Sequence, residues 1–201
     1  MGEKISFLIA AHNEEKMIKY VLSNLAKLPY KNFEVVVGLD GCTDRTLDIV
    51  KMFSKKLHKL RYFSFNQRRG KNVIINKAIK LATGDIIIIH DADWVFKYNK
   101  NGIEKLISCF RNPKIGGIAE SFPVEFKKNF SRGNFWYRGS MWFNYLWIEY
   151  LKKNYTKRVG NMLFVDKKKL KFPFLTNIFK RKLFLKKTFP TSPQRLRMLF
   201  R

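Results

Sequence analysis

The stretch DIIIIHDAD, residues 85–93, decides how this chain folds. Its four consecutive isoleucines form an unbroken apolar run instead of an alternation between apolar and polar residues. Such a run is typical of a central strand in a parallel sheet, where helices cover both faces. Two aspartates, Asp91 and Asp93, follow at the point where this strand ends.

Strand-like and helix-like patterns alternate through the residues that precede this stretch. The strand-like runs are Ile5–Ala11, Phe33–Leu39, Arg61–Phe65 and Asp85–His90. Helical spacing of apolar residues extends over Glu14–Leu28, Thr43–Phe53 and Gly70–Ala82. Asn13 is placed to cap the first helix and Pro29 to end it. Strands separated by helices of this length predict parallel strands joined by right-handed crossovers, and hence an α/β fold.

The pattern is less regular after residue 120. Strands are predicted at Glu120–Phe126 and Gly160–Val165, and a helix rich in aromatic residues at Asn134–Lys153. The last 27 residues, 175–201, contain eight basic residues and no acidic residue. Their pattern places no part of them in a core, and it leaves open whether this tail is folded or disordered.

Composition limits the class of protein. A chain of 201 residues with 46% hydrophobic residues can bury a core without disulfides or metals, which excludes an intrinsically disordered protein. Two cysteines and no cleavable signal predict a reducing compartment, the cytoplasm.

The positive charge is concentrated in one part of the sequence. The net charge is +26, and residues 127–201 hold 20 basic and two acidic side chains. Such a surface attracts nucleic acid, anionic lipid or phosphorylated substrates. Lysine enrichment from an AT-rich genome, with a merely solvated surface, is the alternative.

Polar residues follow three of the predicted strands and should meet at one edge of the sheet, where open α/β sheets bind ligands. They lie in residues 10–14, in residues 40–44 and at Asp91 and Asp93. Two carboxylates just past an apolar strand favour a divalent cation, Mg²⁺ or Mn²⁺, with open positions that a diphosphate can fill.

Three blocks of this sequence resemble the signatures of family 2 glycosyltransferases, which are inverting enzymes that use nucleotide-diphospho-sugars. The blocks are ISFLIAAHNEE, VVVGLDGCTDRTLDIV and RRGKNVIINKAIKLATGDIIIIHDADW, in the family's order and spacing. The resemblance implies a GT-A-like, Rossmann-type α/β/α sandwich with a mainly parallel central sheet. It divides the chain into a nucleotide-sugar-binding subdomain (1–120), an acceptor-side extension (121–174) and a basic tail (175–201).

The resemblance also implies roles for individual residues. Asp40 matches the aspartate that hydrogen-bonds the nucleobase edge, and Glu14 matches the acid near the ribose. Lys71 matches a basic residue near the base and phosphates. Asp91 and Asp93 match the D-x-D metal motif that holds the donor diphosphate, with Asp93 as the catalytic position.

Two positions next to each other belong to the first block. Ala10 stands where the family usually has proline, and Ala11 is assigned to the donor-binding residues.

The family also places an acidic general base in a later helix, whereas no Asp or Glu follows Asp166 in this sequence. Either the acceptor needs no base, or an earlier acid such as Glu120 serves, or the chain is shortened and impaired.

These observations predict a metal-dependent glycosyltransferase, cytoplasmic and peripheral on the inner face of an anionic membrane. The acceptor is a glycan or a polyprenyl phosphate, and the latter is already an anionic nucleophile. One alternative is a protein that binds nucleotide sugar without turnover. Another is a basic nucleic-acid-binding module, against which no helix-turn-helix, zinc-finger or RNA-binding motif is present. A sugar nucleotidyltransferase would need a glycine-rich loop, which residues 12–15 do not offer.

Overall fold

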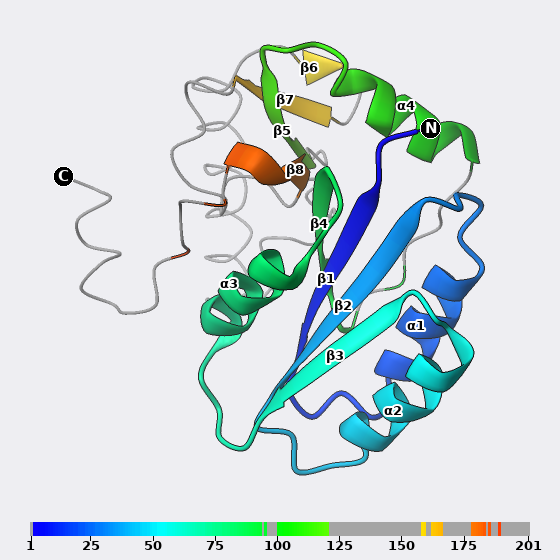
Figure 1. Cartoon of the computed structure of the whole chain (residues 1–201), viewed down its shortest axis with the longest axis vertical. Helices are drawn as coiled ribbons and strands as arrows, with labels where there is room; N and C mark the ends of the chain where they lie inside the picture. The colour runs from blue at the N-terminus through cyan, green and yellow to red at the C-terminus, as the bar shows by residue number, and fades with distance from the viewer. Residues whose placement is uncertain are drawn as a thin grey trace, which may run out of the picture.

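The computed structural model describes residues 2–93, 95, 100–120, 158–159, 162–166, 178–183, 185 and 189. The predicted helix at 134–153 and the predicted strand residues 121–126 lie outside this part of the chain. Within it, the elements alternate between strands and helices as far as residue 120 (Figure 1).

The described strands form one sheet in the order β3-β2-β1-β4-β8-β5-β7-β6. Its first half is parallel and consists of β1 (Ile5–Ala11), β2 (Phe33–Asp40), β3 (Leu60–Phe65) and β4 (Ile86–Asp91). These four strands match the predicted ones to within one residue at each end. The second half is antiparallel and consists of β5 (Ile115–Glu120), β6 (Arg158–Val159), β7 (Met162–Asp166) and β8 (Ile178–Lys180).

Helices cover both faces of the parallel half, with α1 and α2 on one side and α3 on the other (Figure 1). Alternate residues of each strand face the two layers. On β1, Phe7 belongs to the core shared with α1 (Ile18–Ala26), α2 (Thr46–Lys56) and α4 (Lys100–Cys109). Its neighbour Leu8 belongs to the core shared with α3 (Lys71–Leu81). The predicted α/β/α sandwich is therefore confirmed.

Two helices begin later than the sequence predicts. Residues 14–17 form a turn before α1, and Asn13, with φ of 54°, does not cap the helix. Its side chain instead accepts a 2.8 Å hydrogen bond from the Thr43 N–H. α2 begins at Thr46, whose N–H donates to the Asp44 carboxylate over 3.0 Å. The residues at both predicted helix starts instead form hydrogen bonds between the loop after β1 and the loop after β2.

Part of the basic tail lies in the middle of the sheet, although its sequence pattern predicts no strand there. β8 pairs with β4 on one side and with β5 on the other. Phe179 is fully buried, and Phe189 is buried beside it in the core under α3. The sequence left open whether residues 175–201 are folded, and at these positions they belong to the core. The same sheet contains strands from all three predicted segments.

Candidate functional site

The carboxyl ends of β1, β2 and β4 meet at one edge of the sheet. Their registers place Ala11 opposite Leu39, and Ala10 opposite Asp91. Asp40 and the loop of residues 12–15 therefore emerge beside Asp91 at the same edge. This convergence of segments that are far apart in the sequence was predicted, and the strand pairings confirm it.

The loops after β1 and β2 are joined by hydrogen bonds. The Glu14 N–H donates to the Thr46 hydroxyl over 2.8 Å, and the Glu15 N–H donates to the Asp44 carboxylate over 3.0 Å. His12 Nδ1–H donates to the backbone carbonyl of Asp40 over 2.6 Å. These bonds give the edge of the site a fixed backbone.

Ala11 sits at the end of β1 with its side chain in the core and 1% exposed. Its carbonyl accepts a hydrogen bond from the Cys42 thiol over 3.4 Å. Ala11 as a whole is buried, so its assignment to the donor-binding residues stays a prediction. Burial raises the pKa of the Cys42 thiol, which keeps it protonated and unreactive.

The Asp40 carboxylate is buried and bonds to backbone amides of the loop that precedes α3. Its Oδ1 accepts the Arg69 N–H over 2.5 Å, and its Oδ2 accepts the Gly70 N–H over 2.9 Å. The family resemblance assigns this carboxylate to a nucleobase, and Arg68 and Arg69 are not among the predicted site residues. The signal was present in the run RRGK, which places two exposed arginines directly before Gly70 and Lys71.

Lys71 is the first residue of α3, and its ammonium forms an ion pair with the Asp91 carboxylate at the end of β4. The Lys71 side chain is 57% exposed and that of Asp91 is 47% exposed, so a ligand in solvent can reach both. The structure therefore brings together two of the predicted site residues.

Asp93 lies two residues past β4 and is exposed. Burial raises the pKa of Glu14, and the negative charges of Asp93 and Asp44 raise it further, while His12 opposes them. Negative charge therefore accumulates between the loop after β1 and the D-x-D motif. A bound cation would offset this repulsion.

The residues present fit a hard divalent cation that keeps several open positions. Within the described residues, no three His, Cys, Asp or Glu side chains converge on one point. Asp91 and Asp93 offer carboxylate oxygens, which Mg²⁺ and Mn²⁺ prefer, and such ions keep water and phosphate as further ligands. In this structure the cation paired with Asp91 is the Lys71 ammonium.

His90 has a structural role. It is 1% exposed, its Nδ1–H donates to the Asp91 carbonyl over 2.7 Å, and its ring lies edge-on to Phe7. Burial lowers its pKa, which favours the neutral imidazole. His90 is therefore a locally hydrogen-bonded residue near the end of β4.

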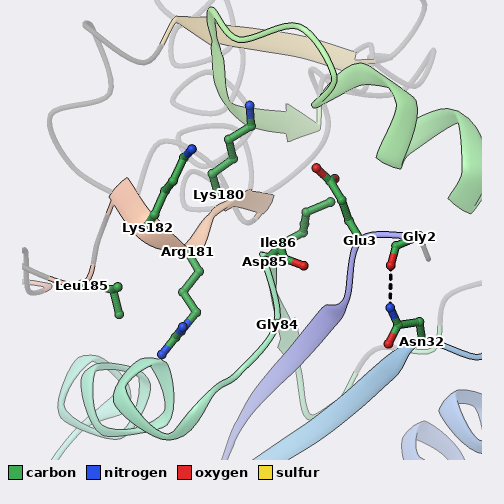
Figure 2. Close-up of a pocket in the computed structure, with 10 residues that line it drawn as sticks. All are labelled: Gly2, Glu3, Asn32, Gly84, Asp85, Ile86, Lys180, Arg181, Lys182 and Leu185. Carbon is green, nitrogen blue, oxygen red and sulfur yellow. Dashed lines mark hydrogen bonds between the residues drawn. The ribbon is translucent and has the colours of Figure 1, made fainter.

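A cavity of about 600 Å³ lies at the opposite end of the sheet. It is bordered by residues that precede β1 and β2, by the start of β4 and by the end of β8 (Figure 2). Lys180 and Lys182 extend to one side of the chain there, and Arg181 extends to the other. The Arg181 N–H donates to the Asp85 carbonyl over 2.8 Å. This cavity is separate from the edge that carries Asp40 and Asp91.

Comparisons with known proteins agree with the fold and with the motifs. The sequence profile described as Glycosyl transferase family 2 matches residues 6–182. The chain is 33% identical over 117 residues to a poly-beta-1,6-N-acetyl-D-glucosamine synthase of Staphylococcus epidermidis, which covers 58% of this chain and 28% of that protein. It is 30% identical over 141 residues to a beta-monoglucosyldiacylglycerol synthase of Nostoc sp., covering 68% of this chain and 29% of that protein. The chain thus spans less than a third of the length of these relatives.

Solved structures show the same fold. The mannosyltransferase PcManGT from Pyrobaculum calidifontis, solved in complex with GDP-Man and Mn²⁺, superposes with a TM-score of 0.65 at 20% identity. The match covers 96% of this chain and 49% of that one. TarS of S. aureus superposes with a TM-score of 0.51 at 27% identity, over 62% of this chain and 24% of that one. Among the described residues, no helix is both long enough and apolar enough to cross a membrane.

Proposed function

Because the chain belongs to glycosyltransferase family 2, we propose that it binds a nucleotide-diphosphate sugar and transfers the sugar to an acceptor. The observation that carries this proposal is the meeting of Asp40, Lys71 and Asp91 at the carboxyl edge of the parallel strands. Ligands of open α/β sheets bind at this edge. The named relatives, a polysaccharide synthase and a glycolipid synthase, support the same reaction class.

The donor is proposed to lie across the ends of β2 and β4. Its base would lie near Asp40 and the loop before α3, its ribose near Glu14 and its diphosphate near Lys71. The exposed guanidinium groups of Arg68 and Arg69 add positive charge beside a phosphate group. This arrangement would place the bond between the sugar and the phosphate near Asp93.

Asp91 and Asp93 are proposed to hold Mg²⁺ or Mn²⁺. When bound, the ion would neutralise the charge that develops on the leaving nucleoside diphosphate. Lys71 can then move its hydrogen bonds from Asp91 to a donor phosphate, because an ammonium is a mobile donor on a flexible stem. Glu14 and Asp44 stay on the same side as Asp93 and add to the attraction for the cation.

The acceptor is proposed to be a lipid phosphate or a glycan at the inner face of a membrane. A phosphate acceptor is anionic at neutral pH and needs no general base to attack. Residues 127–201 hold 20 basic and only two acidic side chains. This positive charge would attract both the phosphate acceptor and an anionic membrane. Co-sedimentation with vesicles that contain or lack anionic phospholipid tests the membrane contact.

A thermal-shift screen tests the donor site. Nucleoside diphosphates are added with and without Mn²⁺ to the wild type, to Asp93→Ala and to a control, Asp48→Ala, which removes an exposed carboxylate of α2. We expect metal-dependent stabilisation by one base in the wild type and the control, and its loss in Asp93→Ala. Stabilisation that is independent of metal, or that survives in Asp93→Ala, would contradict the proposal.

Transfer assays separate the remaining alternatives. Polyprenyl phosphate and glycan acceptors are incubated with labelled nucleotide sugars. Donor binding without transfer or hydrolysis would indicate a binding protein without turnover. Duplex binding with a steep salt dependence that Asp91→Ala leaves unchanged would instead indicate a nucleic-acid-binding module.

A further inference from the structure

The helix that carries Lys71 is fixed at its beginning by a carboxylate of the neighbouring strand. Asp40, at the carboxyl end of β2, is 4% exposed, and each of its oxygens accepts a backbone N–H from the two residues before α3. A carboxylate at this place is also favoured by the positive end of the helix dipole. Both of its oxygens therefore accept hydrogen bonds from the protein itself.

The same strand fixes the other end of the helix. Glu34, near the start of β2, is 5% exposed, and its Oε1 accepts the N–H groups of Thr83 at 2.6 Å and Gly84 at 3.3 Å. These two residues follow α3. One strand thus holds both ends of one helix through two buried carboxylates, and only the Asp40 end lies at the proposed donor site.

The loop that Asp40 holds has no room to move toward the strand. Gly41 has a φ of +63°, and a Cβ on it would lie 2.5 Å from the Arg68 nitrogen. The Gly41 N–H donates to the Phe65 carbonyl over 3.1 Å, which ties the end of β2 to the end of β3. The backbone from Arg68 to Gly70 therefore rests directly on Asp40 and Gly41.

We propose that Asp40 is a positioning residue that sets the first turn of α3, so that Lys71 reaches Asp91 and the donor phosphates. This inference rests on the proposed function and adds to it a role that is distinct from contact with the nucleobase. Lys71 directly follows the Gly70 amide that Asp40 holds, and its ammonium spans the gap from α3 to β4. Movement of Gly70 would therefore move Lys71.

The experiment compares Asp40→Asn with the matched variant Glu34→Gln. In each, an amide replaces a buried carboxylate of β2, and its NH₂ group opposes a backbone N–H. Native-state hydrogen exchange reports the amides directly. We expect exchange at Arg69 and Gly70 to become roughly tenfold faster in Asp40→Asn and to stay unchanged in Glu34→Gln, where Thr83 and Gly84 should exchange faster instead.

Donor binding is then measured by calorimetry with UDP and GDP in the presence of Mn²⁺. We expect a roughly tenfold weaker affinity in Asp40→Asn and an unchanged affinity in Glu34→Gln, although both variants lose stability. Gly41→Ala is a second variant, because it displaces the loop and leaves the carboxylate in place. It should reproduce both effects of Asp40→Asn even if that variant fails to fold.

The outcomes distinguish this role from the function on which it depends. Unchanged exchange at Arg69 and Gly70 overturns the positioning role, and weaker binding without faster exchange shows that Asp40 acts on the ligand directly. Faster exchange with unchanged donor affinity overturns the link to Lys71. If the wild type binds neither nucleotide but the exchange pattern is as expected, Asp40 holds the helix and the proposed function is wrong.

Discussion

The ammonium of Lys71, at the start of α3, forms an ion pair with the carboxylate of Asp91, at the end of β4. A positive charge therefore stands at one of the two carboxylates to which the D-x-D motif assigns a metal ion. A divalent cation that binds there must displace the ammonium or share the carboxylate with it. In the proposed metal site, the two cations would compete for one ligand.

Removing this competitor should tighten metal binding. In Lys71→Met, the affinity for Mn²⁺ without nucleotide should rise about three- to tenfold, because Asp91 is freed and a positive charge is removed. Titration followed by electron paramagnetic resonance of free Mn²⁺ measures this. Lys80→Met removes an exposed charge at the other end of the same helix and should change the affinity much less. Equal gains in both variants, or a loss in Lys71→Met, would contradict the competition.

The pKa of Glu34 predicts a loss of stability in acid. Burial alone would raise this pKa, but hydrogen bonds from Ser6 and Thr83 and the charge of Lys4 lower it from 4.5 to about 2. Because the folded-state pKa is lower than the unfolded one, the carboxylate stabilises the fold above pH 4.5. This contribution, about 3 kcal/mol at most, is lost as the pH falls from about 5 to 2.

Urea unfolding at several pH values measures this contribution. The wild type should lose stability steeply between pH 5 and pH 2, and Glu34→Gln should lose less over the same interval because it has no carboxylate to protonate. Asp48→Asn, on the surface of α2, should retain the slope of the wild type. Equal slopes in Glu34→Gln and the wild type would show that other groups cause the acid sensitivity.

The parallel half of the fold was predictable from local patterns because β1, β2 and β4 each contain at least three consecutive apolar residues, and β3 is rich in aromatic residues. The run at residues 86–89 is buried on both sides, and its neighbours Phe7 and Leu8 face different layers. The edge where polar residues gather was predictable for the same reason, since parallel strands end together. Family resemblance then assigned roles to the residues at that edge.

The directions of individual side chains were not predictable in this way. Asp40 could face a ligand or the backbone, and only the path of the loop before α3 decides between them. β8 was not predicted because a strand of three residues is too short to show an alternation of apolar and polar residues. It forms because its backbone pairs with β4 and β5, which are distant in the sequence. Asn13 was assigned to a helix cap because its contact with Thr43 depends on a residue 30 positions away.

Close packing of α3 on β2 predicts a penalty for any side chain at Gly38. A Cβ there would collide with the Ile74 side chain and lie 2.6 Å from the ring of Phe63. Gly38→Ala should therefore lower the free energy of unfolding by about 1–3 kcal/mol. Combination with Ile74→Ala, which removes the colliding methyl group, should be less destabilising than the sum of the two single variants. Additive effects in urea unfolding would contradict this contact.

The position of β8 predicts that a residue in the basic tail stabilises the whole domain. Phe179 is 0% exposed, pairs in register with Ile87 and packs in the core beneath α3. Phe179→Ala should lower the free energy of unfolding by about 3–5 kcal/mol, because it removes a large buried ring and leaves a cavity. Leu185→Ala, at a position 48% exposed, should change it by less than about 0.5 kcal/mol. If both variants unfold at the wild-type urea concentration, the tail lies outside the core and β4 pairs with another segment.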